Sequence, residues 1–193
     1  MPADAALLDL EPLTSAERRD LLWLARLSIR AAFEPDVSPP RITLTRLLIE
    51  PTAAFVTLHN DGRLRGCVGT VTPDQPLHET VTRMARSAAF DDPRFPALAA
   101  VEVPAIEIEI SRLSRMVPAA ADAVQPGTHG VCISYDSQRA LFLPQVATMH
   151  GWDRETLLNE LCRKAFLPSS AWRRPGCELL VFVAEVFCEG RDC

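Results

Sequence analysis

The sequence lacks the long uncharged apolar run that a membrane-spanning helix requires. Such a helix needs about 20 predominantly apolar residues, whereas the longest run, Leu179 to Ala184, is only long enough for a strand. No basic cluster precedes an apolar stretch near the start, so a signal peptide is not expected. We therefore expect a cytoplasmic protein without a membrane partner.

An excess of positive charge is also missing. The 193 residues include 20 Lys and Arg against 25 Asp and Glu, which gives a net charge of −5. Nucleic-acid-binding proteins usually carry a basic footprint. The charge balance disfavours a nucleic-acid partner and makes RNA binding or modification the weakest functional hypothesis.

The usual signatures of metal and cofactor sites are absent as well. None of the six cysteines forms a C-x-x-C pair, and none is spaced with the four histidines as zinc ligands are. Neither a G-x-G-x-x-G nor a G-x-x-x-x-G-K-[ST] loop occurs, which argues against dinucleotide-binding and P-loop folds. We predict no metal and no cofactor.

The composition is that of an ordinary globular protein, with 48% hydrophobic and 23% charged residues. A chain of this length suits one domain or two small packed halves. We expect a single domain over residues 14–189, with two unequal subdomains as the alternative. Residues 1–13 are predicted to form a flexible N-terminus.

The first half of the chain predicts a helix, a β-hairpin and a second helix. Thr14 and Glu17 form a capping-box pattern, and the helix that they open should end near Phe33. Residues 53–59 and 64–68 read as strands joined by the turn Asn60-Asp61-Gly62. A helix should follow from Pro76.

The second half predicts more strands and one further helix. Residues 106–113 alternate between isoleucine and polar side chains, as a half-buried strand does. Residues 119–123 read as a linker, and residues 131–135 and 139–143 as a second hairpin. A helix capped by Asp153 should follow, and residues 178–189 should form one strand in the centre of a sheet.

A hairpin followed by a helix thus occurs twice. This order predicts an α+β fold with a mixed or antiparallel sheet and flanking helices. It also suggests two pseudo-duplicated β-hairpin–helix halves around a cleft.

The best candidate for a functional site is the segment Leu64–Gly69, LRGCVG, which we call the LRGCVG segment. Glycine inside a strand weakens it and often marks a bulge or a close approach to the backbone, so Gly66 and Gly69 are candidate binding residues. Cys67 between them is a candidate nucleophile, and the neighbouring Arg65 would favour its thiolate. Alternatively, Cys67 fills a tight spot where two backbones pack.

Other residues could complete such a site. His129, in a glycine-flanked turn, is the best candidate base for Cys67, although a loop histidine can equally be a spectator. Arg94 could hold an anion or lock its own loop by pairing with Asp91 or Asp92.

Three further side chains have two interpretations each. Gln145 is a candidate binding residue or a cap of the following turn. Glu107 and Glu109 are candidate binding residues or the solvent-facing half of a strand.

Several segments together resemble the AMMECR-domain family, whose bacterial and archaeal members are called AmmeMemoRadiSam system protein A. They are FVTLHNDGRLRGCVGT, AAFDDPRFPAL, IEIEISRLS, PGTHGV, LFLPQVATMHGWD and LCRKAFLP, and they occur in the family's order. The LRGC-x-G pattern is the family's hallmark. The chain departs from the pattern at Val68, at Thr128, where lysine is common, and at Phe166, where glycine is common.

The resemblance implies an α+β fold of two unequal parts around a cleft, with the LRGCVG segment as the functional surface. It also implies two partners, a Memo-like protein and a radical SAM enzyme, but no reaction. The first functional hypothesis is therefore an accessory, non-catalytic protein that docks these partners. The alternative is a cleft enzyme that uses Cys67 as a reactive thiol on a small molecule. A homodimer is left open.

Overall fold

The computed structural model describes residues 8–34, 36 and 41–190, and residues 1–7 of the predicted N-terminus lie outside this part. The described chain forms two compact units. Unit 1 comprises residues 8–10 and 114–184, and unit 2 comprises residues 11–113 and 185–190. The chain leaves unit 2 between Leu113 and Ser114 and returns between Ala184 and Glu185.

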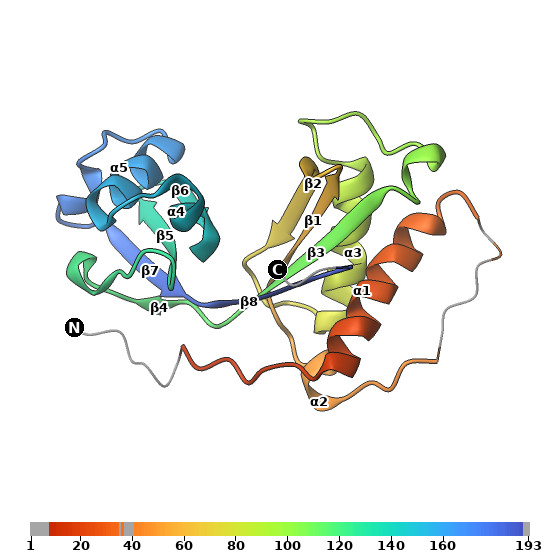
Figure 1. Cartoon of the computed structure of the whole chain (residues 1–193). Helices are drawn as coiled ribbons and strands as arrows, with labels where there is room; N and C mark the ends of the chain where they lie inside the picture. Colours follow the sequence, from red (N-terminus) through yellow and green to blue (C-terminus); the bar gives the residue numbers. More distant parts are fainter. Residues whose placement is uncertain (1–7, 35, 37–40, 191–193) are drawn as a thin grey trace. The chain divides into compact units, whose positions relative to one another are not determined.

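Unit 2 is built on a four-stranded sheet in the order β2-β1-β3-β8. Its strands are β1 (Ala54–Asn60), β2 (Arg63–Thr70), β3 (Ile106–Leu113) and β8 (Ala184–Cys188). Strand β1 pairs antiparallel with both β2 and β3. The helices are α1 (Ser15–Arg30), α2 (Arg46–Ile49) and α3 (Leu77–Phe90), followed by the 3-10 helix η2 (Ala100–Glu102). Figure 1 shows α1 and α3 side by side against this sheet.

The core of unit 2 lies between these two helices and one face of the sheet. The predicted alternation in β3 is confirmed, because Ile106, Ile108 and Ile110 are all buried. Buried side chains of the neighbouring elements join them, namely Val56, Leu58, Leu21, Ala25, Val81 and Ala85. Because side chains alternate along a strand, the polar residues of β1 and β3 occupy the opposite face of the sheet.

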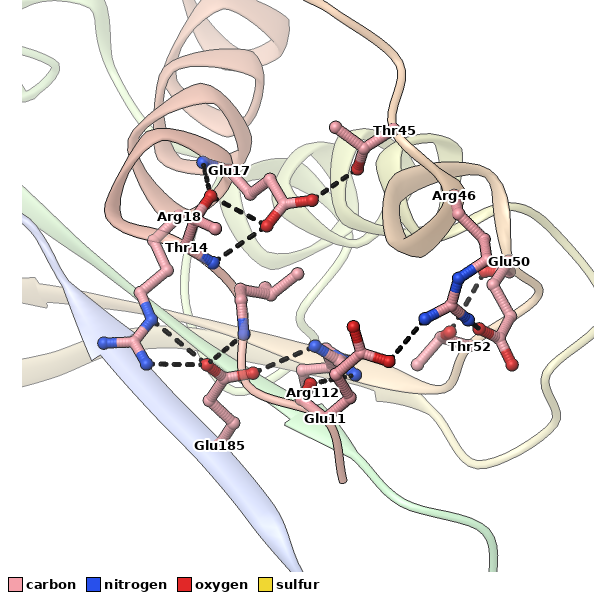
Figure 2. Close-up of polar contacts among 11 residues, drawn as sticks. Glu11, Thr14, Glu17, Arg18, Thr45, Arg46, Glu50, Thr52, Arg112 and Glu185 are labelled. Atoms are coloured by element: carbon pink, nitrogen blue, oxygen red, sulfur yellow. Dashed lines mark hydrogen bonds and ion pairs between the residues drawn. The ribbon is translucent and has the colours of Figure 1, made fainter. Parts of the chain in front are cut away.

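The start of α1 is attached to the sheet by polar contacts. The predicted capping box is present, since the Glu17 N–H donates to Thr14 Oγ1 and the Thr14 N–H donates to Glu17. Glu185 on β8 accepts hydrogen bonds from the Leu13 N–H (2.9 Å), Arg18 (2.8 Å) and Arg112 (3.0 Å). Figure 2 shows these donors converging on the one carboxylate.

Unit 1 has its own four-stranded sheet, in the order β4-β7-β5-β6. Its strands are β4 (Val117–Pro118), β5 (Gly130–Tyr135), β6 (Gln138–Phe142) and β7 (Glu178–Phe182). The helices are α4 (Pro144–His150) and α5 (Arg154–Lys164), with 3-10 helices η3 (Ala121–Ala123) and η4 (Ala171–Arg173). A separate core joins sheet and helices through buried side chains, among them Val131, Ile133, Leu157, Leu158, Leu161 and Val181.

Most predicted elements are confirmed, including both hairpins and the Asp153 cap, whose side chain accepts the Thr156 N–H. The α+β class with antiparallel sheets and flanking helices is also confirmed. Helix α1 ends at Arg30 rather than near Phe33, and β2 runs on to Thr70. No helix in the described part of the chain is long and apolar enough to cross a membrane.

Two predictions are wrong. Residues 178–189 form two strands in two different sheets rather than one, because the backbone leaves β7 at Val183 and begins β8 at Ala184. Residues 119–123 are not a linker, since they lie within unit 1 and the Ala119 N–H donates to the Leu179 carbonyl on β7. Helix α4 was not predicted.

Candidate functional site

The LRGCVG segment forms most of β2, an edge strand of the unit 2 sheet. Its residues alternate between two environments. Val68 packs against the core beneath α3, and Gly66 lies on the same face because it pairs with buried Leu58. Cys67 and Gly69 project from the opposite face, where Cys67 pairs with Thr57.

Gly66 is required by the packing of α3. A Cβ atom on Gly66 would lie 2.1 Å from the carbonyl oxygen of Ala88, in the last turn of the helix. The close backbone approach that the glycine predicted is thus made by the protein's own helix. A side chain at this position would push α3 off the sheet.

Gly69 accommodates an aromatic ring. Its cross-strand partner is Phe55, and a Cβ atom on Gly69 would lie 2.2 Å from that ring. The ring therefore covers the glycine on the polar face of the sheet. Such aromatic cover compensates a glycine that has no side chain of its own to pack.

Cys67 is held by both of its backbone groups. Its N–H donates to Asp92 Oδ2 at 2.8 Å, and its carbonyl accepts from Arg94 Nη2 at 3.0 Å. These are the groups that an edge strand would otherwise offer to another strand. Asp92 and Arg94 therefore occupy the position of a neighbouring strand at the centre of the LRGCVG segment.

Arg94 also pairs with Asp92, which is one of the two locking contacts that its sequence suggested. Arg94 Nε and Nη2 donate to the two carboxylate oxygens of Asp92 at 2.9 and 2.7 Å. The Arg94 hydrogen bond, with those from backbone amides, lowers the pKa of the buried Asp92 carboxyl well below its usual range. The carboxylate consequently stays charged and keeps its hold on Cys67.

The Cys67 thiol has a hydroxyl neighbour. Thr57 Oγ1 donates to Cys67 Sγ at 3.3 Å across the β1–β2 pair. Thr57 is itself opposite Glu109 on β3. A thiol, a hydroxyl and a carboxylate thus form one row across three strands on the polar face of the sheet.

Glu107 and Glu109 both lie on this face of β3, and both are partly exposed. Glu107 is opposite His59 in the register, while Glu109 Oε2 lies 3.8 Å from His59 Nε2. His59 therefore brings a titratable ring close to the row that contains Cys67. His59 was not among the predicted site residues, and its place on the strand that pairs with the LRGCVG segment is the signal that could have indicated it.

Arg65 was expected to lie beside the Cys67 thiol, but its guanidinium group is bound to Glu102. Its Nε donates to Glu102 Oε1 at 2.7 Å and its Nη2 to Glu102 Oε2 at 3.0 Å. This pair raises the pKa of Arg65 and lowers that of Glu102. Arg65 therefore links β2 to η2. The sequence did not predict this contact, because the two residues are 37 positions apart.

His129 and Gln145 belong to unit 1. His129 is buried at the start of β5, where its Nδ1 accepts the Gln125 N–H at 3.2 Å. Burial lowers the pKa of this imidazole, which favours its neutral form. Gln145 follows Pro144 in the first turn of α4. Their candidate roles stay predictions.

Residues 8–34, 36 and 41–190 contain no cluster of three His, Cys, Asp or Glu side chains that could hold a metal ion. The chemistry available around Cys67 on the polar face is that of its thiol, the Thr57 hydroxyl, the His59 imidazole and the carboxylates of Glu107 and Glu109. Asp92, Glu102 and Thr57 were not among the predicted site residues, because each contacts the LRGCVG segment from a position 10 or more residues away in the sequence.

The model of the AMMECR1 family matches residues 22–187. The chain belongs to the AMMECR1 family. It is 37% identical over 189 residues to a protein of Methanopyrus kandleri, with 93% of this chain and 91% of that protein covered. A protein of Methanothermobacter thermautotrophicus is 34% identical over 192 residues, with 92% and 97% covered.

A solved structure shares the fold of this family member. The crystal structure of an uncharacterized protein from Pyrococcus horikoshii matches with a TM-score of 0.79 and 33% identity. The match covers 88% of this chain and 90% of that chain. The family resemblance read from the sequence is therefore confirmed.

Proposed function

We propose that this AMMECR1-family protein is an accessory, non-catalytic component that docks a Memo-like protein and a radical SAM enzyme through the surface around the LRGCVG segment. One observation supports a docking role most. Arg65, the Cys67 backbone and both glycines of the segment contact other parts of the same chain, whereas the Leu64 side chain is 43% exposed.

A second exposed apolar side chain lies in a segment that is paired with the LRGCVG segment. Arg65, next to Leu64, is paired with Glu102, and Val101 beside Glu102 is 85% exposed. The ion pair thus links two segments that each carry an exposed apolar side chain. Apolar side chains surrounded by polar groups are typical of protein–protein contacts.

The docking surface is tested by co-purification of the chain with the Memo-like and radical SAM proteins of the same genome. Leu64→Asp should reduce binding at least tenfold, because a carboxylate would be buried without a partner. Ile49→Asp, at a position 49% exposed on α2, is the matched control and should bind normally. Undiminished binding by Leu64→Asp would overturn the proposal. Gly66 is unsuitable for this test because its substitution disturbs α3.

A second candidate function is that of an enzyme with Cys67 as a reactive thiol. The hydrogen bond from Thr57 Oγ1 to Cys67 Sγ supports it, because it holds the sulfur of a partly exposed thiol in a defined position. Cys67 is partly exposed, whereas Cys132 and Cys162 are buried.

Alkylation with iodoacetamide, followed by peptide mass mapping, tests this alternative in the folded protein. Cys67 should react at least tenfold faster than Cys132 and Cys162, and Thr57→Val should slow it. Thr57→Ser keeps the hydroxyl and serves as the control. If Cys67 reacts fast in Thr57→Val as well, exposure alone explains the rate and the activation by Thr57 is disproved.

A further inference from the structure

A groove lies along β8, at the opposite edge of the unit 2 sheet from the LRGCVG segment. Its volume is about 640 Å³, which is within the range of sites that bind ligands. One wall is the first half of α1, between Ser15 and Trp23, and the other is the chain from Val186 to Gly190. All of these residues belong to unit 2, so the groove is complete within that unit.

The backbone of β8 presents hydrogen-bonding groups along this groove. The Glu189 N–H, just after β8, donates to the Ile108 carbonyl on β3 at 3.0 Å. The Ser114 N–H, just after β3, donates to the Val183 carbonyl at 2.9 Å in the same register. Odd-numbered positions of β8 therefore bond to β3, and Val186 directs its N–H and carbonyl away from that strand. Such an edge can pair with an added strand.

The two edges of this sheet differ in what lies beside them. At β2, Asp92 and Arg94 bond the N–H and carbonyl of Cys67, so the protein's own loop takes the place of a further strand. At β8, the groove lies beside Val186 instead. Domains that recognise extended peptides use such an edge, to which the ligand adds as a strand.

The α1 wall of the groove offers apolar surface to such a strand. Residues 15, 18, 19 and 22 line the groove together because they recur at the spacing of one helix face. Leu22 on this face is partly exposed, and Trp23 beside it is 40% exposed. Alternate side chains of an added strand would point toward α1, where they would contact Leu22 and Trp23.

The charge available in the groove is positive. The Arg19 side chain is 76% exposed, and its ion pair with Asp20 has an N–O distance of 3.7 Å, longer than a hydrogen bond. Arg18 is bound to Glu185 through its Nε and Nη2 (Figure 2). Glu189, the acidic residue of the lining, is held on both carboxylate oxygens by an arginine of α1. Arg19 therefore favours a ligand that carries a carboxylate.

We infer that the groove along β8 binds an extended acidic peptide segment of a partner protein, at a site distinct from the LRGCVG segment. The segment would add to the sheet as a strand and bond the outward N–H and carbonyl of Val186. Its apolar side chains would pack on Leu22 and Trp23, and a carboxylate would pair with Arg19. Backbone pairing supplies affinity in this mode of recognition, and the alternate side chains supply specificity.

Selection from a phage-displayed library of random nine-residue peptides, with the full chain as bait, tests the chemistry of the ligand. We expect peptides that share alternating apolar residues and at least one Asp or Glu. Recovery of no peptide above background, or of peptides without a shared acidic position, overturns the inference.

Fluorescence anisotropy with a labelled copy of a selected peptide tests the backbone pairing. N-methylation of the alternate amides that face β8 should weaken binding about tenfold for each hydrogen bond lost. Methylation of the other alternate amides is the matched control and should leave binding unchanged. Equal effects of the two methylated peptides overturn strand addition, and this comparison leaves the protein itself unaltered.

Variants of the protein locate the peptide in the groove. Val186→Pro removes the outward N–H at an edge position that tolerates proline, and it should weaken binding about tenfold. Val186→Thr keeps the N–H and should bind normally. Arg19→Glu should also weaken binding about tenfold, whereas Arg19→Lys should retain it. Undiminished binding by folded Val186→Pro or by Arg19→Glu overturns the inference, as does a loss of binding in Leu64→Asp.

Sedimentation equilibrium of the same variants tests a second copy of the chain as the occupant. We expect no self-association that depends on Val186. If the unaltered protein formed a dimer that Val186→Pro dissociates, β8 would pair with its own copy and the inference of a peptide ligand would be overturned.

Discussion

At the scale of single residues, Cys67 is positioned by its backbone as much as by its side chain. Asp92 and Arg94 bond its N–H and carbonyl, so the thiol projects from a strand segment that cannot shift without breaking charged hydrogen bonds. This arrangement would serve either proposed role, since it presents the surface of β2 in a fixed geometry.

The Asp92 contact predicts a dependence of stability on pH. Its pKa is lowered in the folded state, mainly by the Arg94 hydrogen bond, so its contribution is present above the unfolded pKa of about 3.9. That contribution is lost as pH falls below about 4 toward the folded value. Urea unfolding from pH 3 to 7 should therefore show the protein losing stability in acid.

Asp92→Asn should lower the free energy of unfolding by about 2 kcal/mol at pH 7, because a hydrogen-bonded charge is removed. The variant should also lose less stability between pH 7 and pH 3 than the unaltered protein does. Asp91→Asn is the adjacent control at an exposed position and should behave as the unaltered protein. If both variants lost the same stability between pH 7 and pH 3, protonation of Asp92 would not be the cause of the acid sensitivity.

At the scale of elements, α1 depends on a carboxylate that the sheet supplies. Glu185 on β8 accepts from the Leu13 N–H, Arg18 and Arg112 (Figure 2). Arg112 is only 4% exposed, and among the residues that the structure describes its Nε has no hydrogen-bond partner. Glu185 is therefore the main compensation for a buried guanidinium charge.

Glu185→Ala should destabilise the protein by about 3–5 kcal/mol, because it leaves Arg112 buried without its carboxylate. Glu155→Ala, which removes an exposed pairing with Arg173, should change stability by less than about 1 kcal/mol. Urea denaturation monitored by circular dichroism measures both. If Glu185→Ala lowered the free energy of unfolding by less than about 1 kcal/mol, water would be solvating the Arg112 guanidinium group in place of Glu185.

At the scale of the whole molecule, residues 114–184 of unit 1 are an insertion between two strands of unit 2. Strands β3 and β8 are neighbours in one sheet, and each unit has its own core. The ends of the insertion also lie close together, since the Ser114 N–H donates to the Val183 carbonyl at 2.9 Å. Insertions with adjacent ends generally leave the host domain able to fold.

Replacement of residues 115–183 by a short Gly-Ser linker should therefore leave unit 2 folded. We expect a cooperative thermal transition and native-like near-ultraviolet circular dichroism from the shortened chain. A matched deletion that removes β8 instead should abolish cooperative unfolding, because β3 then loses one of its two partner strands and the buried Arg112 loses Glu185. A non-cooperative transition in the first variant would show that unit 2 requires unit 1.

The amino-acid sequence by itself determined the local structure and the family. The Thr14–Glu17 capping box, the Asp61-Gly62 turn and the alternation of isoleucines in β3 depend on neighbours within a few residues, and all were predicted correctly. The LRGCVG segment was recognised as unusual because glycine in a strand needs a reason.

Only the tertiary structure decided what those reasons are. Gly66 faces Ala88 and Gly69 faces Phe55, and Cys67 is held by Asp92 and Arg94, 25 or more residues away. The continuous apolar run after Glu178 is divided between two sheets. Burial and hydrogen bonding depend on which distant segments come into contact. Local sequence patterns predict the secondary structure of each segment but not its contacts with the others.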